Sequence, residues 1–155
     1  MPRIILVYSF ALLGACGGGM GGDDDDVIVN CATETRDDEF GIGLTKPGDN
    51  GILQFKLTNA TPAPPIRGDN TWVIEVDSIG ASSAPVDGAT MTVTPFMPDH
   101  GHPAGKTVTI EAAPDPGQYE MAPLNFWMPG LWETTLDVTS PGGNDVVVFR
   151  ICIPS

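Results

Sequence analysis

The sequence predicts an all-β protein, an Ig-like antiparallel β-sandwich of about seven to eight strands. Glycine occurs 19 times and proline 15 times in 155 residues, and this abundance is typical of a chain with many tight turns. The apolar segments are rich in β-branched residues, and several of them alternate apolar with polar positions. No segment after Cys16 shows the periodicity of a helix.

The predicted strands are short segments separated by turn sequences. They cover residues 27–33, 51–60, 70–79, 89–96, 106–112, 118–121 with 124–127, 131–139 and 145–153. The alternation is clearest where Leu53, Phe55 and Leu57 are interleaved with polar residues, which indicates one buried face and one solvated face. Residues 146–151 are apolar on both sides except for Arg150, which predicts an interior strand.

The N-terminus has the pattern of a bacterial lipoprotein signal peptide, predicted over residues 1–15. Arg3 precedes an apolar run of residues 4–13 that is too short to span a bilayer as a helix, and small residues lead to Cys16. Cys16 is the predicted lipidation site, so we expect an exported, lipid-anchored protein of the bacterial cell envelope, periplasmic or at the cell surface. An uncleaved anchor, or secretion with a chance cysteine, is the alternative.

A tether is predicted next, over residues 16–26. It consists of a glycine-rich stretch followed by four aspartates, a composition that cannot bury apolar surface. The remaining residues, 27–155, are long enough for one domain with one core.

The charge balance restricts the partners of the chain. The net charge is −13, and removal of a signal peptide containing Arg3 but no acidic residue makes it one unit more negative. Such a surface repels nucleic acid and anionic lipid headgroups, so membrane attachment is expected through the lipid on Cys16 alone. Cationic ligands are favoured.

The cysteine count predicts a disulfide. With Cys16 assigned to the lipid, Cys31 and Cys152 are an even pair in an oxidising compartment. Their bond is expected to join the first strand to the last. Two free thiols that bind a metal are the alternative.

Two segments carry the residues most suited to chemistry. Residues 96–103 contain His100 and His102, both histidines of the chain, together with Met97. Residues 126–132 contain Met128 in a second Met-Pro step. The strands that precede these two segments are separated by one intervening strand, so in an antiparallel alternation both end at the same pole of the sandwich. The loop of residues 62–68 is expected there as well.

Imidazole and thioether groups together suit copper, with Cu(I) favoured. The predicted metal ligands are His100, His102, Met97 and Met128, with Met121 as a further sulfur donor and Asp99 orienting an imidazole. The alternative is structural: the methionines fill the core beside aromatic rings, and the histidines are exposed turn residues.

The segment 94–102, Tyr119 and the segment 124–132 resemble the corresponding parts of the YtkA-like domains, small exported β-sandwiches related to the FixH group. The resemblance covers residues 51–153. Because FixH-type proteins are linked to copper handling during oxidase assembly, it implies a copper role and a protein that receives the metal.

No catalytic constellation is recognisable, so we expect a protein that is not an enzyme: no serine lies near a histidine in a nucleophile turn, and no glycine-rich phosphate loop opens a helix. Two functional hypotheses follow from the sequence. The first is an envelope protein that binds or delivers copper, and the second is a structural or protein-interaction module without a metal.

Overall fold

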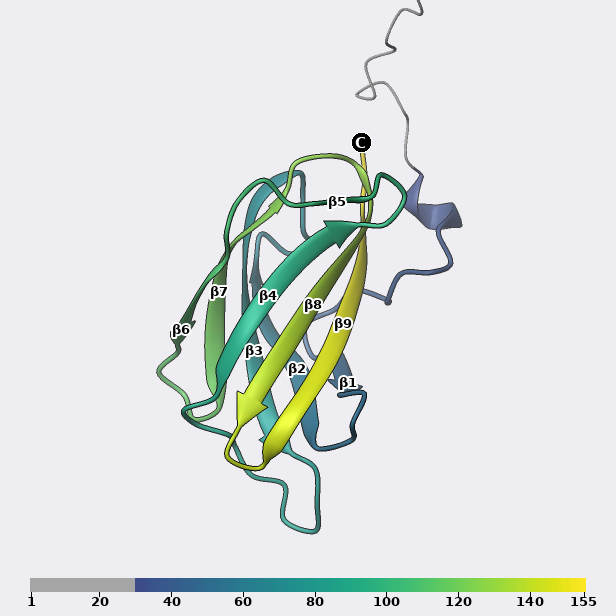
Figure 1. Cartoon of the computed structure of the whole chain (residues 1–155). Coiled ribbons are helices and arrows are strands. Elements are labelled where there is room, and N and C mark those ends of the chain that lie inside the picture. Colours follow the sequence, from purple (N-terminus) through teal and green to yellow (C-terminus); the bar gives the residue numbers. More distant parts are fainter. Residues whose placement is uncertain (1–29) are drawn as a thin grey trace, which may run out of the picture.

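A computed structural model describes residues 30–155, which form two antiparallel sheets packed face to face (Figure 1). One sheet has the strand order β1-β2-β3-β7-β6, and the other has the order β5-β4-β8-β9. The strands are β1 (Thr45–Pro47), β2 (Leu53–Thr61), β3 (Gly68–Ser78), β4 (Thr90–Met97), β5 (His102–Pro103), β6 (Thr109–Ala112), β7 (Gln118–Phe126), β8 (Gly130–Ser140) and β9 (Gly143–Ile153). The all-β prediction is confirmed, with slightly more strands than expected.

The predictions for the signal peptide, for lipidation of Cys16 and for the tether of residues 16–26 lie outside the described residues. Within residues 30–155, no helix is long and apolar enough to cross a membrane.

The core forms between the sheets because alternate residues of each strand point inward. Leu53, Phe55 and Leu57 of β2 are buried, as their alternation predicted. The ring of Trp72 on β3 lies 6.1 Å from that of Phe149 on β9, measured between centroids, so an aromatic pair joins the two sheets.

The strand bounds differ from the prediction where the sequence shows no clear alternation of apolar and polar residues. The two-residue strand β5 was not predicted, and β6 begins at Thr109 instead of at residue 106. β7 is one continuous strand, whereas two separate pieces were expected. β1 forms inside a segment that was expected to be a turn.

The first predicted strand, over residues 27–33, is wrong for residues 30–33, which are the ones that the structure describes. Cys31–Thr33 form a single turn of 3-10 helix, and the side-chain oxygen of Asn30 accepts a hydrogen bond from Ala32 N at 3.1 Å. An asparagine at this position satisfies a backbone donor locally, which favours a turn over a strand. The predicted disulfide is present, with 5.6 Å between the Cα atoms of Cys31 and Cys152, and it ties this turn to β9.

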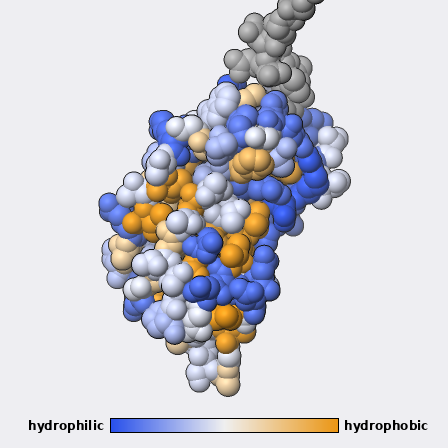
Figure 2. Space-filling view, in the orientation of Figure 1, coloured by the Kyte–Doolittle hydropathy of each residue, from blue (hydrophilic) through white to orange (hydrophobic). Residues whose placement is uncertain are grey.

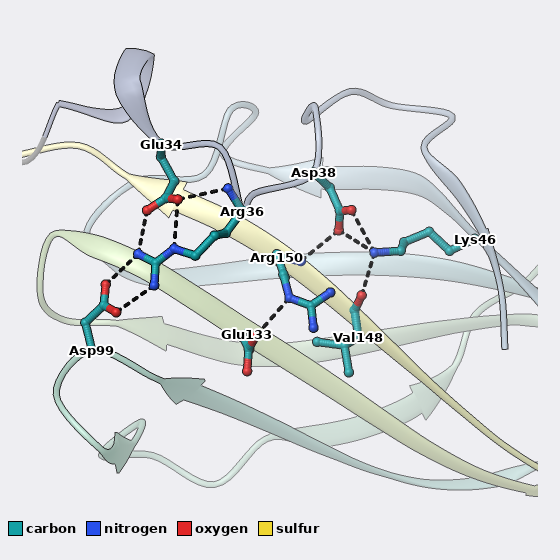
Figure 3. Close-up of polar contacts among 8 residues, drawn as sticks. All are labelled: Glu34, Arg36, Asp38, Lys46, Asp99, Glu133, Val148 and Arg150. Atoms are coloured by element: carbon teal, nitrogen blue, oxygen red, sulfur yellow. Dashed lines mark hydrogen bonds and ion pairs between the residues drawn. The ribbon is translucent and has the colours of Figure 1, made fainter. Parts of the chain in front are cut away.

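The prediction that residues 146–151 form an interior strand is also wrong, because β9 is the last strand of its sheet. The N-terminal segment, residues 34–49, covers this edge. Asp38 N donates to Arg150 O at 2.8 Å, Arg150 N donates to the Asp38 carboxylate at 2.8 Å, and Lys46 Nζ donates to Val148 O at 2.7 Å (Figure 3). The apolar composition of β9 therefore reflects an edge that the chain covers itself.

Candidate metal centre

Three segments that are distant in the sequence meet at one pole of the sandwich, as predicted. β5 lies at this pole, next to the end of β4 (Figure 1). The imidazole of His102 stacks on the ring of Trp127, which follows β7, with 5.1 Å between centroids and 25° between planes. Arg67, from the loop before β3, donates through Nη2 to the Trp127 carbonyl at 3.2 Å.

A tight turn after β4 sets the relative position of Met97 and His102. Met97 O accepts hydrogen bonds from His100 N at 3.3 Å and from Gly101 N at 2.8 Å. Gly101 has φ of +70°, a conformation that glycine adopts at little cost. The chain then reverses, so that Met97 and His102 are direct partners in the β4–β5 register. Residues opposite each other in an antiparallel pair project to the same face of the sheet.

The two histidines are neighbours with different surroundings. Their ring centroids are 5.8 Å apart, and His100 is exposed whereas His102 is half-buried, with its ring 6.2 Å from that of Trp132 in a T-shaped arrangement. His102 Nδ1 lies 3.1 Å from Pro103 O. Because a carbonyl oxygen can only accept, this contact is a hydrogen bond when Nδ1 carries the proton, and Nε2 then keeps its lone pair.

Both predicted methionine ligands are buried at this pole. The side chain of Met97 is 1 % exposed and that of Met128 is 4 % exposed. A Cβ atom on Gly130 would collide with Met97 Cε, so the start of β8 packs directly on this methionine. Met121 pairs with Trp72 and Ile110 in the middle part of β7, away from the strand end that enters the pole.

Asp99 does not orient an imidazole, contrary to the prediction. Its two carboxylate oxygens accept from Arg36 Nη1 at 2.7 Å and Nη2 at 2.8 Å, and Arg36 also pairs with Glu34 (Figure 3). The hydrogen bonds from Arg36 lower the pKa of Asp99 and hold the pKa of Glu34 at about 2. The N-terminal segment therefore fastens the turn that carries the histidines.

Sequence reasoning missed Arg36, Trp127 and the Pro103 carbonyl at this pole. Arg36 is 63 positions from Asp99, and no local pattern relates them. The sequence could have indicated Trp127, because this residue directly precedes the Met128-Pro129 step. In the described part of the chain, no three side chains of His, Cys, Asp or Glu form a group that could hold a metal ion. The candidate donors at the pole are therefore two imidazoles and the methionine sulfurs.

Comparison with known proteins identifies the family. The YtkA-like family matches residues 51–137, which is more than half of the chain. The chain belongs to the YtkA-like family. The matched region contains Met97, both histidines and Met128, but ends within β8, whereas the resemblance was expected to continue to residue 153. No curated protein and no solved structure matches this YtkA-like chain.

Proposed function

We propose that this YtkA-like protein is a lipoprotein of the bacterial cell envelope that binds copper, as Cu(I), at the pole formed by β4, β5 and the connection from β7 to β8. One observation carries the proposal: Met97 and His102 face the same side of the sheet in direct register, and the ring of His100 lies 5.8 Å from that of His102. This register supports a site that combines a nitrogen donor with a sulfur donor.

The spacing of the imidazoles suits a shared ion. With metal–nitrogen bonds of about 2.0 Å, two imidazoles on one ion have centroids roughly 4.5 to 6.5 Å apart. The contact of His102 Nδ1 with Pro103 O leaves Nε2 as the donor atom, and a backbone carbonyl is a frequent partner of the second nitrogen in metal-bound histidines.

The methionines add soft donors, which favour Cu(I) over harder ions. Met97 is the first sulfur ligand in this proposal because of its register with His102, and Met128 is the second. Trp127 stacks on His102, and its 43 % exposed side chain offers an aromatic face to a cation bound at this imidazole.

The acidic surface and the predicted anchor support the same role. A net charge of −13 raises the local concentration of cations. Lipidation at Cys16 would keep the domain near its membrane, where a metal-receiving protein is the proposed partner. The expected relation to FixH-type proteins fits this role.

Anaerobic titration with Cu(I) against a competing chelator tests the proposal on the soluble domain that starts at residue 27. We expect affinity tighter than micromolar and a loss of at least about 100-fold when His100→Ala and His102→Ala are combined. Met97→Leu and Met128→Leu preserve volume, and each is expected to weaken binding by about 10-fold. Met121→Leu is the matched control, because Met121 is equally buried but lies mid-strand. Binding weaker than micromolar, or unchanged in the histidine variant, would contradict the proposal.

The alternative, a structural or protein-interaction module without a metal, is supported by the burial of the two methionines. Met97 and Met128 pack as core residues, and Met128 O accepts a hydrogen bond from Trp132 Nε1 at 3.0 Å. This alternative predicts that purified protein carries no copper. If the purified protein retains one copper ion per chain after washing with a chelator, the metal-free alternative is contradicted.

A further inference from the structure

The sheet edges differ in how the chain protects them. The edge of β9 is covered by the N-terminal segment, as described above, and Asp49 N adds a hydrogen bond to Val146 O at 2.8 Å. The edge strand β1 has three residues and ends in Pro47, which cannot donate to a further strand. The edge strand β6 has four residues and carries Glu111.

The outer edge of β4 is different, because β5 covers only its end. Phe96 and Met97 pair with β5, and Ala104 N donates to Pro95 O at 2.9 Å. Backbone groups of an antiparallel strand alternate in direction, so Met91 and Val93 present their N–H and C=O groups on the same side as Pro95 O. Within residues 30–155, no strand pairs with this side of Thr90 to Thr94.

This free part of β4 also lacks the usual protection of an edge strand. Residues 90–94 contain no lysine, no proline and no charged side chain. They are three threonines that alternate with Met91 and Val93, which is a sequence well suited to accept another strand.

An apolar groove lies beside the free edge. It has a volume of about 340 Å³, and Ala89, Met91, Ile110, Ala112 and Tyr119 are among its lining residues. Figure 2 shows an apolar patch on this side of the molecule, between β4 and β7. Tyr119 is fixed in place, since its hydroxyl donates to Val86 O at 2.7 Å and accepts from Ala89 N at 2.9 Å. The groove is therefore preformed.

The charges around the groove are acidic. Asp87 lies in the turn that leads to it, and Asp137 is the β8 partner of Thr92. Lys106, in the segment that connects β5 to β6, is paired with Asp69 at 2.6 Å. With a net charge of −13, the chain repels a second copy of itself and attracts a basic segment.

We infer that the free edge of β4 is a docking site for an extended basic segment of a partner protein, which adds a strand next to residues 90–94. Alternate apolar side chains of the segment enter the groove between Met91 and Ile110, and the lysine or arginine side chains between them face the acidic rim. This site does not depend on copper.

The test uses the full chain in a mild detergent and measures hydrogen exchange of the segment 90–94. The probe is a synthetic eight-residue peptide in which lysine and valine alternate. The control peptide has the same composition with all lysines before all valines. We expect slower exchange in residues 90–94 with the alternating peptide at millimolar concentration, weakened by added salt, and no change with the control peptide.

Two variants of the protein sharpen the test. Met91→Lys places a positive charge in the groove and is expected to weaken peptide binding at least fivefold, whereas Ile79→Lys changes an exposed apolar residue elsewhere and is expected to have no effect. Met91→Pro removes a backbone N–H from the free edge of β4 without removing a hydrogen bond to β8. It should weaken peptide binding as much as Met91→Lys does. Equal protection by both peptides, no protection, or self-association through residues 90–94 overturns the inference.

Discussion

At the scale of single residues, Asp145 fixes the turn between β1 and β2 against the start of β9. It is fully buried, and its carboxylate accepts hydrogen bonds from the backbone N–H groups of Asn50 at 2.8 Å, Ile52 at 2.9 Å and Leu53 at 2.9 Å. Burial raises its pKa, but these donors outweigh that effect and the pKa is lowered. A side chain on Gly48 would collide with this carboxylate, so the turn requires glycine there.

Asp145→Asn is therefore expected to lower the free energy of unfolding by about 3 kcal/mol at neutral pH, because the amide group leaves buried donors without an acceptor. The lowered pKa also fixes the pH dependence. The carboxylate stabilises the fold above its ordinary pKa of 3.8, and this contribution is lost as the pH falls towards the lower pKa of the folded state. Urea unfolding at neutral pH and at about pH 3 should show a smaller difference between wild type and variant in acid. A difference that is constant with pH would contradict this account.

Gly130 is a second position where a single residue has a large structural role, here at the pole that carries the histidines. Its φ is +128°, and a Cβ atom there would collide with Met97 Cε. We expect Gly130→Ala to destabilise the protein by about 2 kcal/mol, measured by thermal unfolding. Gly105→Ala is the matched control, because a Cβ at Gly105 meets no atom within 4 Å and its φ is not positive. Equal melting temperatures of the two variants would refute the packing role of Gly130.

At the scale of elements, the sequence predicts the long strands well and the short ones poorly. β2, β3 and β8 are long enough for one buried face to impose a period of two residues. β1 and β5 have three and two residues, so no period can be read from them. The edge position of β9 could not be predicted, because its covering depends on Asp38, which is 112 residues from Arg150.

The N-terminal segment should depend on the disulfide for its place along β9. The bond closes a loop with a sequence separation of 121 residues, for which chain entropy predicts a stabilisation of about 5 kcal/mol. Combined Cys31→Ser and Cys152→Ser substitutions are expected to lower the free energy of unfolding by up to this amount and to speed hydrogen exchange at Arg150. Unchanged exchange at Arg150 would show that the contacts of Asp38 and Lys46 hold the segment alone.

At the scale of the whole molecule, the antiparallel topology determines which loops meet. The ends of β4 and β7 could be assigned to one pole from strand alternation alone, and the stacking of His102 on Trp127 bears this out. The pairing of Arg36 with Asp99 could not be predicted, since it depends on the path of the N-terminal segment around the sandwich. The sequence therefore indicated the candidate donors, and the fold adds the groups that hold their turn in place.

The most direct test of the central claim is X-ray absorption at the copper edge, on protein loaded anaerobically with an equimolar amount of Cu(I). The claim is that nitrogen and sulfur donors from β4, β5 and the β7–β8 connection face one point. The account predicts imidazole nitrogen and thioether sulfur in the same coordination shell, with the sulfur contribution reduced in Met97→Leu. A shell without sulfur, or a spectrum unchanged when both histidines are replaced by alanine, would contradict it.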